Sequence, residues 1–482
     1  MFSPLFTSLF VLGYFSLLIL ISKKSSKSSN DDAFFIGERK SPWYVVSFGM
    51  IGATLSGITF LSVPGWVEKN QFFYLQMVLG YVPGYLFVAY ILMPIYYKMN
   101  IYSIYEYLKL RFGYFAHKSG ATYFLISRLL GASLRLYLVV LVLQTILFDL
   151  VGFPFFMTSL ITIVLIFFYT YKSGIKTIIW TDTLQTSLML ITLVMCTLII
   201  FRDLGYDSIG QSISMNNLDL NIFLFSNFEN SSNFYRSFIA GMFIAIAMTG
   251  LDQDMMQKNL SCKNLKEAQK NMVWFSVLLV FVNIVFLYLG SLLYQYAYVN
   301  GIDTSGDKLF VDVVKFGKLG KITMIFFLLG LMSAAFSSAD SALTSLTTCI
   351  CIDFLNFNKK NKITKISRNY IHVFVSILLF LIIIAVNYLN NDNIISTLFK
   401  VASFTYGPLV GLFLFGLIST RIVNDNYIPV IVLLSPIFSY LISKYDTLLL
   451  FGFDFGPDLL IVNGIFTFLM LYICSSKKKQ IN

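Results

Sequence analysis

Apolar stretches of about 20 residues recur from one end of the chain to the other. A helix of that length crosses a hydrocarbon core of roughly 30 Å, whereas a β-barrel needs short alternating segments, which the sequence does not contain. Hydrophobic residues make up 57% of the 482 residues and charged residues only 12%, and the mean hydropathy is +0.76. This leaves too little polar surface to cover a soluble globule, so we predict an all-α polytopic protein that has lipid as its solvent.

The apolar stretches divide into about 13 predicted spans, each bounded by charged or turn residues. They lie near residues 3–21, 44–66, 74–97, 119–150, 154–171, 177–201, 234–257, 272–295, 321–350, 369–388, 396–419, 427–443 and 457–474. The first stretch lacks the basic start and the small-residue cleavage pattern of a signal peptide, so we expect it to remain as a helix.

Lysine and arginine are concentrated in alternate loops. The basic loops are residues 23–40, 98–118, 172–176, 258–270, 359–368 and 477–479. The positive-inside rule then places the N-terminus outside and the C-terminus inside, in agreement with an odd number of spans. Orientation in the membrane thus accounts for the net charge of +11, and no nucleic acid partner is expected.

The sequence offers no features of an enzyme. No hydrophilic segment is long enough for a soluble catalytic domain, the largest lying near Asp203–Ser232. The five cysteines form neither a metal-ligand set nor a disulfide framework, and no nucleophile is paired with a base. Short loops and unpaired cysteines suit a bacterial inner membrane.

Two predicted spans contain small and polar residues at mid-depth, Gly52–Gly57 in one and Met248–Gln253 in the other. Secondary transporters build binding sites from helices broken at such points, because unwound carbonyls replace the water shell of an ion. Each break falls in the first helix of a five-helix unit if the repeats cover 44–201 and 234–419. An inverted repeat predicts this pattern, with 3–21 and 427–474 as extra helices. Close helix packing is the alternative reading of either break alone.

Charged and hydroxyl side chains inside other spans are candidates for ion binding. Ser337, Asp340 and Ser341 share one helical face, and a carboxylate with neighbouring hydroxyls supplies the oxygen ligands of a hard cation. Asp182 lies in the first turns of its span and offers a further carboxylate, unless it marks the membrane boundary.

Arg128 and Arg135 lie seven residues apart on one helical face. An arginine within the membrane usually meets a carboxylate partner or an anionic ligand. These arginines could form a structural ion pair with Asp252 or Asp340, or they could contact the solute, and the sequence favours neither role.

Several short motifs, taken in order, resemble those of the sodium/solute symporter family, which includes sodium-coupled sugar, proline, iodide and sialic acid carriers. The motifs are Phe35-Ile36-Gly37-Glu38-Arg39, Tyr105–Gly113, Trp180-Thr181-Asp182 with Gln185, Asp252-Gln253 followed by Gln257-Lys258, the Ser337-Ser338 region ending at Asp353, and Gly407-Pro408.

This resemblance implies a LeuT-like core of two inverted five-helix repeats and a main sodium site. Its expected ligands are backbone oxygens of Gly52, Leu55 and Ala334 and the hydroxyls of Ser337 and Ser338. The second sodium site of some members resembles what Asp182, Ser337, Asp340 and Ser341 offer here. Asp340 departs from the family, in which a Ser or Thr is expected.

The residues expected to bind solute do not match those of the sugar carriers. Ile58 and Thr59 replace polar residues after the first break, and Met248 replaces a tyrosine, which disfavours a hexose. The candidates for a site that holds a small polar or anionic solute are Thr54, Ser56, Thr59, Gln76, Arg135, Asp252 and Gln253.

We therefore predict sodium-driven symport by alternating access, by a chain that acts as a monomer with Na⁺ as coupling ion and without a cofactor. The alternatives are a transporter-fold sensor without net transport, a proton-coupled carrier and a channel; the broken helices argue against the channel.

Overall fold

The computed structural model describes residues 4–25, 31–149, 152–171, 174–215, 218–355, 365–389, 394–445 and 455–477. The helices that form the bundle in the first half are α1 (Pro4–Ser25), α3 (Trp43–Thr54), α4 (Gly57–Gly65), α6 (Tyr74–Phe87), α7 (Met93–Met99), α9 (Tyr114–Leu143), α10 (Phe155–Thr170) and α11 (Ile175–Asp203). Those of the second half are α13 (Phe234–Ala245), α14 (Gln253–Leu260), α15 (Leu265–Val299), α17 (Gly320–Cys349), α18 (Lys365–Leu389), α19 (Ile394–Ile418), α20 (Ile428–Lys444) and α22 (Leu459–Ile473).

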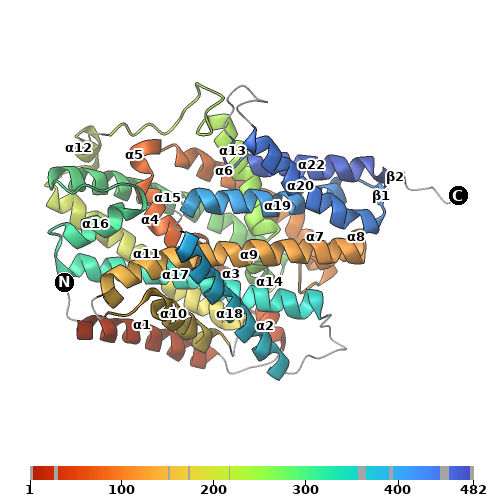
Figure 1. Cartoon of the computed structure of the whole chain (residues 1–482), viewed down its shortest axis with the longest axis horizontal. Coiled ribbons are helices and arrows are strands. Elements are labelled where there is room, and N and C mark those ends of the chain that lie inside the picture. Colours follow the sequence, from red (N-terminus) through yellow and green to blue (C-terminus); the bar gives the residue numbers. More distant parts are fainter. Residues whose placement is uncertain are drawn as a thin grey trace.

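Short elements connect these helices. They are α2 (Asp31–Ile36), α5 (Val67–Asn70), α8 (Glu106–Arg111), α12 (Ile209–Ser214), α16 (Leu309–Phe316) and the antiparallel pair β1 (Ile422–Val423) and β2 (Ser475–Ser476). Figure 1 shows α1 along one edge of the helical bundle, with α20 and α22 toward the opposite edge and α3, α11 and α17 between them.

Within the described residues, 8 helices are long and apolar enough to cross a membrane, or 10 if each of two bent pairs is one span. The 13 predicted spans also include α1 and the shorter apolar helices α10 and α22. The total number of spans and their orientation stay predictions.

Both predicted helix breaks are confirmed. Helices α3 and α4 meet at 60°, and the segment Phe234–Gly250 meets α14 at 66°. Leu55 and Ser56 leave the helical conformation at the first break, while the Asp252 side chain caps α14 by accepting hydrogen bonds from the Asp254 and Met255 amides at 2.8 and 3.3 Å. Each break therefore leaves backbone groups free of the regular helical ladder inside the bundle.

Glycines allow α6 and α13 to pack backbone to backbone. A Cβ on Gly80 would lie 2.0 Å from the Phe238 carbonyl oxygen, and one on Gly241 would lie 2.1 Å from the Met77 carbonyl oxygen. Small residues at helix contacts allow this close approach in membranes.

Gly241→Ala is expected to destabilise the protein by about 1–3 kcal/mol, because α6 and α13 must separate to admit the methyl group. Thermal unfolding in detergent measures this as a lowered midpoint. Gly210→Ala is the control, since no atom lies within 4 Å of its added Cβ. An unchanged midpoint for Gly241→Ala would contradict the close packing.

Candidate functional site

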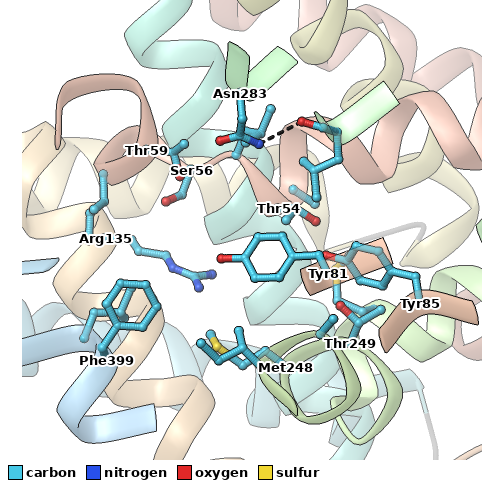
Figure 2. A pocket seen from close by; sticks show the side chains of 18 of the residues that line it. Thr54, Ser56, Thr59, Tyr81, Tyr85, Arg135, Met248, Thr249, Asn283 and Phe399 are labelled. Carbon is cyan, nitrogen blue, oxygen red and sulfur yellow. Dashed lines mark hydrogen bonds between the residues drawn. The ribbon is translucent and has the colours of Figure 1, made fainter. Parts of the chain in front are cut away.

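A cavity of about 100 Å³ lies at the first helix break. Three of the candidate solute ligands, Thr54, Ser56 and Thr59, contribute to its wall from α3, the break and α4. Aromatic side chains from α6 and α19 complete much of the lining, among them Tyr81, Tyr85 and Phe399 (Figure 2). The cavity thus combines apolar surface with a few hydroxyl groups, as small-molecule sites do.

Two arginines, Arg128 and Arg135, line this cavity, and they differ in their partners. The guanidinium of Arg135 extends into the space between Tyr81 and Phe399 in Figure 2. No carboxylate of the described residues forms an ion pair with Arg135, and its Nε atom is buried without a hydrogen bond. An unpaired cation in such a place has its charge available for an anionic ligand.

Arg128 lies seven residues earlier on the same face of α9 and has a different role. It forms an ion pair with Asp254 and lies 3.9 Å from an Asp252 oxygen. Asp252 also accepts a hydrogen bond from the Tyr406 hydroxyl. Asp252 and Asp340 were the two carboxylates predicted as partners of these arginines, and the structure pairs Arg128 with Asp252. It also adds Asp254, which sequence reasoning did not select.

Three predicted solute ligands do not line the cavity. Gln76 donates to the Ser232 carbonyl at 2.9 Å and accepts from the Leu224 amide at 3.0 Å, which holds the loop before α13. Gln253 donates to the Tyr102 carbonyl at 2.8 Å, and Asp252 is the cap of α14. Their hydrogen bonds stabilise the backbone, so they remain candidates only in another conformation.

Sequence reasoning missed most of the cavity wall. The additional lining residues include Tyr74, Tyr81, Tyr85, Thr249, Asn283 and Phe399. Aromatic residues in an apolar helix usually pack against neighbours or lipid, so only the tertiary arrangement separates these tyrosines from the others.

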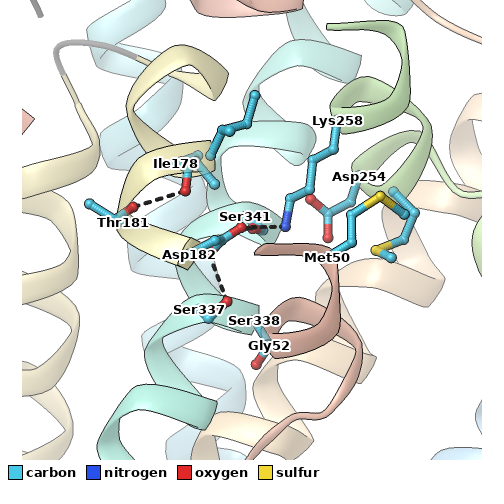
Figure 3. A network of polar contacts seen from close by, with 12 residues as sticks. Met50, Gly52, Ile178, Thr181, Asp182, Asp254, Lys258, Ser337, Ser338 and Ser341 are labelled. Atoms are coloured by element: carbon cyan, nitrogen blue, oxygen red, sulfur yellow. Dashed lines mark hydrogen bonds and ion pairs between the residues drawn. The ribbon is translucent and has the colours of Figure 1, made fainter. Parts of the chain in front are cut away.

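The predicted ligands of the main sodium site come together where the first break meets α17. A Cβ on Gly52 would lie 3.3 Å from the Ser337 hydroxyl oxygen, and Figure 3 shows Gly52 beside Ser337 and Ser338. Leu55 lies in the break, and Ala334 lies one helical turn before Ser338. The Gly52 amide donates to the Thr186 hydroxyl at 3.1 Å, which fixes the break against α11. Gly52 and Ser337 thus lie near one another, and the role of these residues as sodium ligands stays a prediction.

Asp182 is buried inside the helical bundle. Both Asp182 and its ion-pair partner Lys258 have 1% side-chain exposure, and the Lys258 ammonium lies 2.7 Å from an Asp182 oxygen. Ser337 donates to Asp182 at 2.6 Å and Ser341 at 3.4 Å, as Figure 3 shows.

Counting Lys258 among the loop lysines was wrong, because α14 carries it into the protein interior. Its position in a polar stretch after the second break made it look like part of a loop. The burial of the ammonium is compensated by Asp182, which lies 76 residues earlier in the chain.

Asp340 is fully buried, and neither of its carboxylate oxygens has a hydrogen-bond partner among the described residues. It shares the helix face of Ser337 but does not form an ion pair with Arg128. No group of three or more His, Cys, Asp or Glu side chains in the described part of the chain is arranged to hold a metal. Any ion bound here would therefore rely on hydroxyl and backbone oxygens besides single carboxylates.

Comparison with curated proteins finds several sodium-coupled carriers. The human sodium/iodide cotransporter is 24% identical over 271 residues, which cover 53% of this chain and 41% of that protein. The sodium/sialic acid symporter NanT of Aliivibrio fischeri is 28% identical over 280 residues, covering 56% of this chain and 53% of that protein. The chain thus spans about half the length of the curated relatives it matches.

Solved structures are similar over nearly the whole chain. A Na⁺-coupled sialic acid symporter in a substrate-bound, outward-open state superposes with a TM-score of 0.82 at 20% identity, covering 98% of this chain and 99% of that one. The nucleobase-cation-symport-1 family transporter Mhp1 gives 0.59 at 15% identity, covering 92% and 94%. These likenesses confirm the predicted all-α, LeuT-like fold.

The sequence model of one family covers most of this fold. The Sodium:solute symporter family model matches residues 34–426, a range that includes both helix breaks and every residue of the two predicted sodium sites. The motifs from Phe35 to Gly407-Pro408 fall within the same range. This chain belongs to the Sodium:solute symporter family.

Proposed function

We propose that the chain is an integral membrane symporter that uses sodium to drive uptake of a small organic anion. The observation that carries the proposal is the Arg135 guanidinium, which has no ion pair among the described residues and lies in a cavity whose wall includes Thr54, Leu55 and Ser56 at the first break. The same break supplies the predicted sodium ligands Gly52 and Leu55. A carboxylate is the group that suits Arg135 best, because a guanidinium binds it through two parallel hydrogen bonds.

The coupling follows from this shared segment. Sodium at Gly52, Leu55, Ala334, Ser337 and Ser338 holds the broken helix against α17, and thereby orders the cavity wall that contacts the solute. Each ligand then raises the affinity of the other by the same factor. The membrane potential adds about 2.3 kcal/mol per charge per 100 mV to inward sodium movement. Alternating access then requires only that the protein with both sodium and solute bound closes to the outside and opens to the inside.

The proposal extends to the setting of the protein. All five cysteines are free, and the connections between the helices are mostly short, which suits a bacterial inner membrane. We also propose that the monomer is the transporting unit, because the cavity lies inside one helical bundle, between α3, α6, α9 and α19.

A sodium-specific thermal shift is expected for the purified protein, with potassium as the control, and one carboxylate of a solute library should enlarge it. Reconstituted vesicles should then take up that solute only with an inward sodium gradient, with saturation and counterflow. Binding without uptake would favour a sensor, and uptake driven by a proton gradient without sodium would favour a proton-coupled carrier. No sodium response in folded protein would refute sodium symport.

Ser338→Ala is expected to remove most of the sodium shift, because it deletes one of the few side-chain oxygens of the main site. Ser439→Ala is the matched control. Ser439 is also buried, and its hydroxyl donates to a carbonyl of its own helix at 3.0 Å, as that of Ser338 does. An equal loss in both variants would show that the effect is not local to the site.

A further inference from the structure

Asn283 brings an amide group into the wall of the main cavity from α15, whereas Arg135 reaches the same cavity from α9. The Asn283 side chain is 1% exposed, and its amide nitrogen donates to the Leu279 carbonyl at 2.8 Å. Figure 2 shows this side chain with its hydrogen bond at the edge of the cavity. The Asn283 Oδ1 atom is buried and has no hydrogen-bond partner among the described residues.

The hydrogen bond to Leu279 also decides which way the amide group points. A carbonyl oxygen only accepts hydrogen bonds, so the Asn283 atom that faces it must be the nitrogen, and the other atom must be the oxygen. The group left for a ligand at Asn283 is therefore an acceptor. A buried acceptor without a partner is costly, and a solute that donates a hydrogen bond to it removes that cost.

Thr54 adds a second polar group without a partner to the same wall. Its hydroxyl oxygen is buried, and no described residue forms a hydrogen bond with it. A hydroxyl both donates and accepts, so Thr54 can bind either a carboxylate or a hydroxyl of the solute. The cavity therefore offers a guanidinium for a carboxylate and, at Asn283, an acceptor for a separate donor group.

The charge of the cavity separates a hydroxyl donor from an ammonium donor. Two arginines line the cavity, and none of its described lining residues is an aspartate or a glutamate. An ammonium group bound here would lose its water without gaining a counterion, and it would meet the positive charge of the arginines. A neutral hydroxyl carries neither penalty.

The volume of the cavity limits the size of the solute. It is about 100 Å³, and much of its wall is apolar, with Met248, Leu279 and Phe399 among the lining residues. An apolar cavity of about 150 Å³ holds benzene, which has about six non-hydrogen atoms. The cavity thus suits a short carbon chain and has no room for a large sugar acid.

We propose that Asn283 determines specificity by accepting a hydrogen bond from a hydroxyl group of the solute, and that the solute is a short hydroxycarboxylate. This inference rests on the proposed function, in which Arg135 binds the carboxylate, and narrows the organic anion to one chemical class. Asn283 then separates hydroxy acids from the parent acids that lack a hydroxyl, while the absence of a lining carboxylate disfavours amino acids.

Two matched sets of ligands test the proposal by titration calorimetry on the purified full-length chain in saturating sodium. One set is lactate, propionate and alanine, which differ in a single substituent; the other is 3-hydroxybutyrate, butyrate and 3-aminobutyrate. In at least one set, the hydroxy acid should bind about tenfold more tightly than the parent acid, because only the hydroxy acid donates to Asn283. The amino acid should bind most weakly.

Asn283→Leu keeps the size of the side chain and removes the acceptor. It should bind the hydroxy acid about tenfold more weakly and the parent acid no more weakly, so that the preference disappears. Asn300→Leu is the matched control. The Asn300 amide group likewise donates to a carbonyl four residues earlier, at 2.9 Å, but Asn300 is exposed and does not line the cavity. This control should keep the full preference for the hydroxy acid.

The other outcomes separate this inference from the proposed function. Equal binding of hydroxy and parent acids in both sets, tightest binding of an amino acid, or a preference that survives in Asn283→Leu overturns the role of Asn283 while anion symport stands. Binding of a large sugar acid alone overturns the size limit. A sodium response without binding of any carboxylate refutes the proposed function itself. If Asn283→Leu does not fold, Asn283→Ala and the wild-type order of affinities decide the question.

Discussion

Arg135→Met is expected to weaken solute binding about 100-fold while the affinity for sodium stays the same. The variant removes two charge-assisted hydrogen bonds to the solute carboxylate, together about 3 kcal/mol. Arg135 has no ion-pair partner among the described residues, so its removal leaves no carboxylate uncompensated and the fold should persist. Titration calorimetry with the carboxylate identified by the thermal-shift screen measures the loss.

Two further variants make this prediction specific. Arg135→Lys keeps the charge but loses the two parallel hydrogen bonds of a guanidinium. Its affinity for the solute should lie between those of the wild type and Arg135→Met. Lys400→Met removes a neighbouring cation that is exposed and does not line the cavity, although the adjacent Phe399 does. It should bind solute normally. Solute binding that survives in Arg135→Met would show that the arginine does not contact the solute.

Lys258→Gln is expected to destabilise the protein by about 3–5 kcal/mol, because Asp182 would be left as a buried charge without its partner. The double variant Asp182→Asn with Lys258→Gln should recover much of this loss, since neither charge remains. Unfolding of the detergent-solubilised variants in sodium-free buffer measures the differences. Similar losses in the single and double variants would show that the Lys258–Asp182 contact does not govern stability.

The matched control for Lys258 is Lys176, which pairs with Glu38 at 3.3 Å but is 30% exposed. Lys176→Gln should cost less than about 1 kcal/mol, because water screens the pair and solvates the remaining carboxylate. Sodium added to Lys258→Gln should restore stability if the ion can take the place of the ammonium at Asp182. Failure of sodium to do so would show that this position accepts only the lysine.

The sequence predicted the fold class and the two helix breaks because these are local properties. The length of an apolar stretch is set by the thickness of a bilayer, and small residues with polar neighbours interrupt a helix wherever it is placed. Gly52, Ser337 and Ser338 were selected on family resemblance, and the structure brings them together at the first break.

Only the tertiary structure shows which buried charges are neutralised by an ion pair and which are left to bind a ligand. Arg128 and Arg135 both line the cavity from one helix, yet Arg128 forms an ion pair with Asp254, 126 residues away, whereas Arg135 has no ion pair among the described residues. Lys258 looked like a loop residue and instead meets Asp182 inside the bundle. Local periodicity tells which face a side chain occupies, but not which helix covers that face. The partner of a buried charge depends on helix packing, and this packing alone separates a structural ion pair from a group left to bind ligand.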